Sequence, residues 1–283
     1  MGLRAWLAVL TMTFGTWTMP VHAGQGALTL GFMPYLNAET VLEKYTPLAR
    51  YLGAKLGREV RIEVAKDYAE HIRRTGQDEL DISFLGGSPY VVIGDEYGRK
   101  PLLARFEFAG KPTFRSVIFV AKDSPIQAVA DLKGKTMAFG NRNSTLSTQV
   151  PLYTLIQGGV GLDDLKAHEH LRNHDNVVMG VEVGDFDAGA VAEEVFHEYR
   201  GKAVRVLAYS PELSTHVFVA SQAMAPELRQ AVADALLGVK DDPAGGEVLR
   251  AIGADLTGFV TAADSDYDLH RDMLGKVLPM LDR

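Results

Sequence analysis

The sequence contains no cysteine in any of its 283 positions. This absence excludes disulfide bonds, thiol nucleophiles, zinc–thiolate sites and iron–sulfur clusters. It also disfavours trivalent arsenic as a ligand, because that soft centre prefers thiolates. A chain without disulfides depends on its hydrophobic core for stability. A chain of this length can build one large core or two smaller ones.

Basic residues are outnumbered by acidic ones. The chain has 29 Lys and Arg against 36 Asp and Glu, for a net charge of −7. A nucleic-acid-binding surface needs a basic stripe, so we expect no nucleic-acid partner. An acidic protein can still bind an anion if dipoles and hydrogen-bond donors are aimed at it locally.

Long hydrophobic runs are also missing, apart from one at the N-terminus. Arg4 precedes a largely apolar run from Ala5 to Phe14, and "VHA" at 21–23 has the small-x-small form of a cleavage site. The run is short for a membrane span. We therefore predict a signal peptide over residues 1–23 and an exported, periplasmic protein. The alternative is a retained N-terminal anchor, but no lipid-anchored cysteine is available.

Strand-like and helix-like segments alternate along the chain, and the same order restarts near residue 118. The pattern predicts strands at 27–34, 59–65, 81–87, 102–109 and 115–123, helices at 38–56 and 68–80, and a helical stretch over the last 60 residues. This alternation is typical of an α/β fold with mostly parallel sheets flanked by helices. We predict two lobes, 24–117 plus 217–283 and 118–216, joined by a two-strand hinge, with a ligand cleft at the strand ends.

A hydroxyl-rich segment, "GNRNSTLSTQVP" at 140–151, lies between a predicted strand and a predicted helix. It places Ser144, Thr145, Ser147 and Thr148 within five residues. Backbone N–H groups at a helix start, together with hydroxyl donors, can bind an oxyanion without a counter-charge. Ser and Thr are also favoured helix caps, so this segment alone leaves both interpretations open.

Five segments, in order, resemble the periplasmic binding proteins of phosphonate, phosphite and phosphate ABC importers. They are "PLARYLGAKLGREVRIEVAKDYAEHI" (47–72), "DELDISFLGGSPYVV" (78–92), "RSVIFVAKDSPIQAVADLKGKTMAFGNRNST" (115–145), "NHDNVVMGVEVGDFDAGAV" (173–191) and "LAYSPEL" (207–213). The resemblance implies a two-lobed protein that closes on a small tetrahedral oxyanion and presents it to an ABC permease.

The resemblance also implies which residues hold the phosphoryl oxygens. Ser144 and Thr145 match the family's hydroxyl loop, His174 matches its histidine and Tyr68 its tyrosine. His174 would add a donor whose charge responds to pH. From the residues alone, Tyr68 could instead be a packing residue, and His174 with the following acid could be a helix cap.

Two positions depart from the family pattern around the oxyanion. The third loop hydroxyl falls on Leu146, although Ser147 is adjacent, and a second tyrosine falls on Phe114. We also include Gly87 and Ser88 as candidate ligand-binding residues. The glycines after the strand at 81–87 do not have a recognised phosphate-loop pattern.

A third departure concerns the organic part of the ligand. In members that bind aminoalkylphosphonates, two carboxylates grip the amine; one position matches Glu194 and the other falls on His216. We therefore expect a smaller or differently shaped oxyanion than an aminophosphonate. The neighbouring Glu193 is expected on a solvated face, because long carboxylates are mostly exposed.

Enzyme and metal signatures are weak. His168, His170 and His174 cluster in the sequence, but no HExxH or GxSxG motif is present. We expect no catalysis, no metal and no cofactor, and a monomer whose partners are the ligand and a permease. The alternative is a sensory module that signals ligand status to a membrane histidine kinase, since both roles use lobe closure as the signal.

Overall fold

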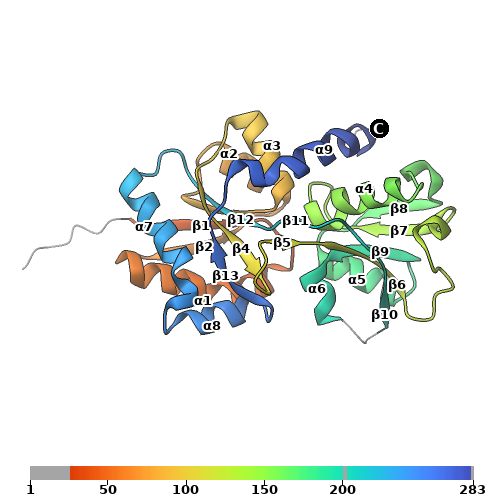
Figure 1. Cartoon of the computed structure of the whole chain (residues 1–283), viewed down its shortest axis with the longest axis horizontal. Helices are drawn as coiled ribbons and strands as arrows, with labels where there is room; N and C mark the ends of the chain where they lie inside the picture. The colour runs from red at the N-terminus through yellow and green to blue at the C-terminus, as the bar shows by residue number, and fades with distance from the viewer. Residues whose placement is uncertain (1–25, 200–202, 282–283) are drawn as a thin grey trace, which may run out of the picture.

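The computed structural model describes residues 26–199 and 203–281 (Figure 1). The predicted signal peptide at 1–23 lies outside the described residues. Figure 1 shows two α/β bodies side by side, joined by thin connecting strands. Within the described ranges, no helix is both long and apolar enough to cross a membrane.

Lobe 1 is built on a sheet with the strand order β13-β4-β12-β3-β1-β2. Its strands are β1 (Leu28–Phe32), β2 (Val60–Val64), β3 (Ile82–Leu85), β4 (Leu102–Phe108), β12 (Val217–Ala220) and β13 (Leu256–Val260). The helices of this lobe are α1 (Ala38–Leu56), α2 (Tyr68–Gly76), α3 (Gly87–Tyr97), α7 (Pro226–Leu237), α8 (Gly245–Ile252) and α9 (Asp268–Leu281).

Lobe 2 is built on a second sheet, with the strand order β10-β6-β9-β7-β8. Its strands are β6 (Ser116–Ala121), β7 (Thr136–Phe139), β8 (Ala167–His170), β9 (Ala188–Ala192) and β10 (Val204–Tyr209). The helices of this lobe are α4 (Val150–Gln157), α5 (His174–Glu182) and α6 (Glu193–Glu198).

A short antiparallel ribbon lies where the chain crosses between the two sheets. It pairs β5 (Thr113–Phe114) with β11 (Leu213–Ser214). The predicted boundary after residue 117 falls inside β6, which belongs to the second sheet from Ser116 onward. The predicted boundary after residue 216 falls directly before β12. A hinge at this ribbon would therefore involve both crossings at once.

The predicted two-lobed α/β fold is confirmed, but two details of the prediction are wrong. Each sheet is mixed rather than mostly parallel: β1 pairs in parallel with β2 and β3, whereas β12 runs antiparallel to β3 and β4. The reversed strands of lobe 1 are β12, which arrives from the other lobe, and β13, which follows α8 of the same lobe. The last 60 residues are not all helical, because β13 pairs with the edge of β4.

The longest helix shows why local sequence sufficed for many elements. α1 begins where the Asn37 side chain accepts the N–H of Thr40 at 2.9 Å, and it ends at Gly57 in the left-handed region, with φ 65°. Both are standard helix end signals. Its apolar side chains recur at helical spacing and are buried against the sheet, at Val41, Tyr45, Leu48 and Leu52.

The C-terminal helix α9 contacts both lobes. It starts over lobe 1 and extends toward lobe 2 (Figure 1), where it packs on α4. The Lys276 ammonium lies 5.3 Å from the centre of the Tyr153 ring on α4, within range of a cation–π interaction. Near its start, His270 Nε2 lies 3.1 Å from the carbonyl oxygen of Ser214 in the hinge ribbon.

Candidate oxyanion-binding cleft

The hydroxyl-rich segment forms a π-helical turn over residues 145–149, between β7 and α4. Ser144 precedes the turn with an extended backbone, and its Oγ accepts the N–H of Ser147 at 3.3 Å. Ser144 is therefore a helix cap, as one of the two interpretations requires. π-turns often occur at functional sites. Those hydroxyls of this turn that face the other lobe are the candidate donors to a ligand.

Ser144 lies between a tyrosine of lobe 1 and a histidine of lobe 2. The Tyr68 hydroxyl, at the start of α2, faces Ser144, and this contact acts against the rise in the pKa of Tyr68 that burial causes. On the other side, Ser144 Oγ lies 3.5 Å from His174 Nε2, at the start of α5. All three side chains are almost completely buried. The structure thus brings together three residues that are far apart in the sequence.

The protonation state of His174 follows from its contacts. The N–H of Ala192 points at His174 Nδ1, at 3.4 Å, so Nδ1 is the acceptor nitrogen and Nε2 carries the proton. Burial lowers the pKa of His174 to about 3. The imidazole therefore offers a neutral N–H donor toward the cleft. With these contacts the imidazole is neutral at physiological pH, and a pH response of the ligand-binding site stays a prediction.

Thr145 forms the second contact across the lobes. Its Oγ1 accepts the backbone N–H of Ser88, at the start of α3, at 3.1 Å. The approach depends on glycine: a Cβ on Gly86 would lie 2.6 Å from Thr145 Oγ1, and one on Gly87 would lie 2.3 Å from the His270 ring. Ser88 Oγ is fully buried and has no hydrogen-bond partner among the described residues. Gly87 thus contributes space rather than a hydrogen bond.

The remaining hydroxyls of the turn face into lobe 2. Ser147 Oγ donates to the carbonyl of Ala190, and Thr148 Oγ1 donates to the carbonyls of Gly140 and Asn141 at 3.2 and 2.9 Å. The structure therefore does not bring Ser147 together with Ser144, Thr145 and His174 as a cleft-facing donor. The π-turn rotates Ser147 toward β9, so it does not replace the hydroxyl missing at Leu146.

Leu146 is itself a core residue. Its side chain is 2% exposed and belongs to the main hydrophobic cluster. Its carbonyl accepts the Ser116 hydroxyl at 2.7 Å. The position that carries a hydroxyl in the family is thus occupied here by an apolar side chain and held by a buried hydrogen bond at the start of β6.

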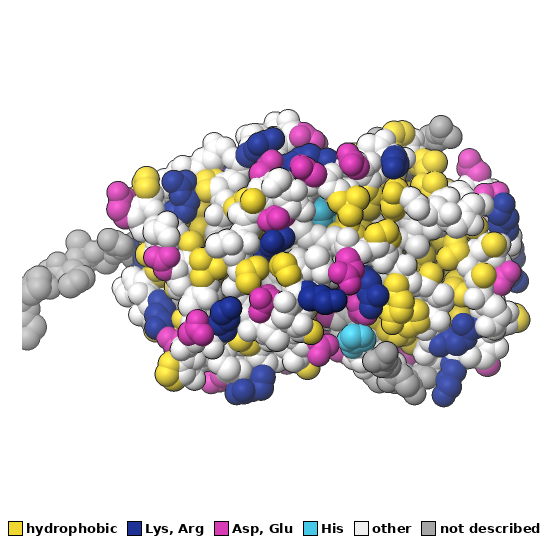
Figure 2. Space-filling model, in the orientation of Figure 1, with side chains coloured by type: hydrophobic (Ala, Val, Ile, Leu, Met, Phe, Trp, Pro, Cys, Tyr) yellow, Lys and Arg dark blue, Asp and Glu magenta, His cyan; other side chains and the backbone are white. Residues whose placement is uncertain are grey.

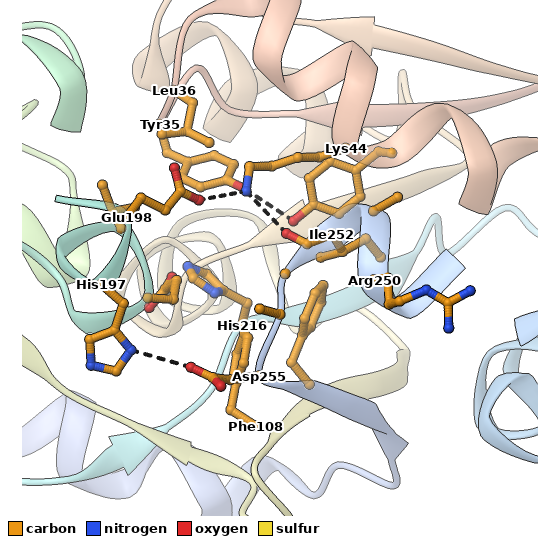
Figure 3. Close-up of a pocket in the computed structure, with 17 residues that line it drawn as sticks. Tyr35, Leu36, Lys44, Phe108, His197, Glu198, His216, Arg250, Ile252 and Asp255 are labelled. Carbon is orange, nitrogen blue, oxygen red and sulfur yellow. Dashed lines mark hydrogen bonds and ion pairs between the residues drawn. The ribbon is translucent and has the colours of Figure 1, made fainter. Parts of the chain in front are cut away.

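We call the junction of Tyr68, Ser88, Ser144, Thr145 and His174 the cradle. A cavity of about 360 Å³ lies beside it, between α6 of lobe 2 and the α1, α8 and β4 elements of lobe 1 (Figure 3). Tyr35, Tyr45, Phe106, Glu194 and His216 are among the residues that line it. Tyr35 connects the cavity to the cradle, because its carbonyl accepts the N–H of His174 at 3.1 Å.

His216 borders the cavity on the side of the hinge, where its ring packs against aromatic side chains. The His216 ring lies 4.8 Å from Phe114 and 4.7 Å from Phe84, measured between ring centres. Burial lowers the pKa of His216 to about 3. The imidazole is therefore uncharged near neutral pH. Phe114 is buried and offers no polar group.

An ion pair and a histidine–carboxylate hydrogen bond lie at the mouth of the cleft. Lys44 of α1 lies 2.9 Å from Glu198 of α6, and His197 Nδ1 lies 3.2 Å from the Asp255 carboxylate; Figure 3 shows both pairs at the rim of the cavity. In Figure 2, basic, acidic and histidine side chains meet at the waist between the lobes. These contacts join the two lobes in a closed arrangement.

Sequence reasoning missed several of these groups, namely Tyr35, Tyr45, Lys44 and Asp255. Tyr35 could have been found, because it follows the C-terminal end of β1, where ligands of α/β sheets bind. Lys44 and Asp255 carry no local signal, since each acts through a partner in the other lobe. The histidines at 168 and 170 lie on the edge strand β8, and no metal-binding group of three His, Cys, Asp or Glu side chains occurs among the described residues.

Comparisons with known proteins show the family to which the chain belongs. A profile of the family described as "ABC transporter, phosphonate, periplasmic substrate-binding protein" matches residues 30–267. The chain is 24% identical over 202 residues to a probable ABC transporter phosphite binding protein, PhnD1, of Prochlorococcus marinus (strain MIT 9301). That match covers 69% of this chain and 67% of the relative.

A second relative is the phosphonates-binding periplasmic protein of Escherichia coli (strain K12), 29% identical over 161 residues. The match covers 54% of this chain and 48% of that protein, so it spans about half of the relative's length. Among solved structures, that of Prochlorococcus marinus PhnD1 in complex with methylphosphonate superimposes with a TM-score of 0.81, at 21% identity, over 89% of this chain and 98% of that one. The chain belongs to the family of periplasmic substrate-binding proteins of phosphonate ABC transporters.

Proposed function

We propose that the protein captures a small phosphonate-type oxyanion between its lobes and delivers it to the permease of an ABC importer. The observation that carries this proposal is the meeting of Ser144, Thr145 and His174 from lobe 2 with Tyr68 and Ser88 from lobe 1. These residues come from separate segments, and each supplies a hydrogen-bonding group at the junction.

The chemistry of the cradle suits an anion. Hydroxyl groups and the Nε2–H of neutral His174 can all donate, and none of them brings a fixed charge. Hydrogen bonds from such donors to an ionised oxygen contribute about 1.5–3 kcal/mol each. Several convergent donors can therefore bind an oxyanion in a protein whose net charge is −7. The ligand replaces the contacts that these residues now make with one another.

We propose that the ligand is small. The relatives are named for phosphite and phosphonates, and the solved neighbour carries methylphosphonate. We also propose that the protein reaches the periplasm by cleavage of residues 1–23 and that it does not turn its ligand over. N-terminal sequencing of the exported protein should begin at Gly24, and incubation with phosphonates should release no phosphate.

A ligand screen tests the proposal. Thermal unfolding and calorimetry are measured with phosphate, phosphite, methylphosphonate, sulfate and arsenate. A ligand present at one hundred times its Kd should stabilise the folded state by about 2.7 kcal/mol. A double substitution, Ser144→Ala with Thr145→Ala, should abolish binding without unfolding the protein. Stabilisation by a sugar or an amino acid, with no response to any oxyanion, would contradict the proposal.

A further inference from the structure

The start of the C-terminal helix α9 is fixed to lobe 1 and to the hinge. The Tyr267 hydroxyl, directly before the helix, donates to the carbonyl of Thr215 at 3.2 Å. In the first turn, His270 Nε2 donates to the carbonyl of Ser214 at 3.1 Å. Both carbonyls belong to the segment that crosses from lobe 2 to lobe 1. Tyr267 and His270 are fully buried, so this end of the helix follows lobe 1 and the hinge.

The other end of α9 packs on lobe 2. The Lys276 ammonium lies over the Tyr153 ring of α4, and the helix also lies against the π-helical turn of the cradle. Met280 and Leu281 line a cavity of about 320 Å³ whose other walls belong to lobe 2, for example Leu162. Figure 1 shows the helix reaching from one body toward the other. α9 therefore joins the lobes at a second place, apart from the hinge ribbon.

Gly275 lies in the middle of α9, between these two ends. It is exposed, and a Cβ added to it would meet no atom within 4 Å among the described residues. Packing in this structure therefore does not require a glycine there. Glycine inside a helix is less favourable than alanine, because it loses more backbone freedom when the helix forms. The position weakens the helix without improving its packing.

Pro279 weakens the helix at the same place. It is also exposed and lies inside α9. A proline lacks the N–H that would bond to the carbonyl four residues earlier, and its ring crowds that carbonyl. The residue four positions before Pro279 is Gly275. Two features of the sequence thus weaken α9 at one point, between the half fixed to lobe 1 and the half that packs on lobe 2.

We infer that α9 is a strap that fastens the two lobes together in the absence of ligand, and that it bends or detaches at Gly275 when the cleft opens. Rotation of the lobes about the hinge ribbon moves Tyr153 relative to the fixed start of the helix. A straight helix cannot keep the contacts at both of its ends during this motion. The closed state therefore has contacts of α9 that the open state lacks, and they shift the equilibrium toward closure before any ligand binds.

The distance between the lobes can be measured directly because the chain has no cysteine. Glu43→Cys on α1 and Glu182→Cys on α5 place one label on each lobe, at exposed positions. Double electron–electron resonance of the spin-labelled, ligand-free protein then gives the populations of open and closed states. The test variant is Gly275→Ala, which strengthens the helix at the proposed bending point.

Gly94→Ala in α3 is the matched control. Gly94 also lies inside a helix, and the nearest atom to a Cβ added there is Arg99 Cγ at 3.7 Å, an ordinary contact. α3 packs within lobe 1 at this end. The control therefore makes the same gain in helix propensity without acting on a segment that joins the lobes.

Gly275→Ala should lower the ratio of open to closed populations about fivefold, the factor that corresponds to the difference in helix propensity between Gly and Ala. Gly94→Ala should leave this ratio as in the wild type. A chain that ends at Gly275 should become more open and bind methylphosphonate at least threefold more weakly. If this shortened chain does not fold, Tyr153→Leu decides: it removes the cation–π contact, keeps an apolar side chain and should shift the populations in the same direction.

Equal populations in the wild type, Gly275→Ala and the shortened chain or Tyr153→Leu would overturn the inference. A shift caused equally by Gly94→Ala would overturn it as well, because helix propensity alone would then explain the change. The distance measurement needs no ligand. Failure of methylphosphonate to bind would therefore count against the proposed function, while the populations still decide whether α9 is a strap.

Discussion

Thr145 and Thr148 lie in one π-helical turn, both are buried, and their hydroxyls face opposite directions. Thr145 Oγ1 accepts the N–H of Ser88 from the other lobe, whereas Thr148 Oγ1 donates to carbonyls of its own lobe. Replacing each threonine by valine keeps the shape of the side chain and removes only the hydroxyl. The pair therefore separates a role in ligand capture from a role in folding.

The structure predicts different losses for the two substitutions. Thr145→Val removes a donor to the ligand, which contributes about 1.5–3 kcal/mol, so affinity should fall about ten- to a hundredfold. The Ser88 N–H also loses its acceptor, but only in the closed state, because the partners belong to different lobes. Thr148→Val removes a hydrogen bond present in both open and closed states. Its cost of about 1–2 kcal/mol should lower the Tm by about 2–8 °C, with affinity within threefold of the wild type.

Calorimetry with methylphosphonate and thermal unfolding of the ligand-free protein measure the two effects separately. Thr145→Val should change the Kd with little effect on the ligand-free Tm, and Thr148→Val should do the reverse. If Thr145→Val keeps its affinity and loses stability instead, the turn is only a helix start and the cradle must lie elsewhere.

Two further predictions concern core residues. Leu146→Ser should lower the free energy of unfolding by about 2–4 kcal/mol, because it empties a core position. If the variant instead keeps its stability and binds phosphonate more tightly, the new hydroxyl reaches the ligand and the prediction is wrong. Stability should also fall as the pH drops below about 6.5, because four buried histidines have lowered pKa values and the unfolded chain binds protons before the folded one. The four histidines are His71 (pKa about 4), His174 (about 3), His216 (about 3) and His270 (about 4). Chemical unfolding between pH 7.5 and pH 4 measures how the free energy of unfolding changes with pH. A free energy of unfolding that does not change over this range would contradict the prediction.

Most elements could be predicted from the sequence because their signals are local. The helix at 38–56 carries its own cap, its own apolar spacing and its own terminal glycine. The missed strands are short and lie at sheet edges: β8 reads "AHEH" and is exposed, and β13 reads "LTGFV" after a helix-rich stretch. Such strands form because a partner edge is available, and that partner is distant in the sequence.

The candidate site was predictable to the level of segments but not of side-chain direction. Ser144 and Thr145 were found because they lie between a predicted strand and a predicted helix, where backbone donors are unpaired, whereas His174 and Tyr68 were found through the resemblance to the phosphonate-binding family. The π-turn directs Thr145 toward Ser88 and Ser147 toward Ala190. No residue type in the sequence predicts such a turn. The groups at the rim depend on lobe closure, which brings together residues more than 150 positions apart in the case of Lys44 and Glu198.

Closure of the lobes depends more on hydrogen bonds to the ligand than on the contacts between charged side chains at the rim of the cavity. The Lys44–Glu198 pair has side chains 18% and 54% exposed, and exposed pairs of this kind contribute about 0–1 kcal/mol. The cradle offers several hydrogen bonds to an ionised oxygen at about 1.5–3 kcal/mol each. A ligand shifts the equilibrium between open and closed states only by its difference in affinity for them. Because the donors come from both lobes, that difference arises at the cradle, while the Lys44–Glu198 pair joins α6 to α1. The same short helix carries Glu194 and Glu198, which both border the cavity, so these carboxylates meet lobe 1 only when the lobes close.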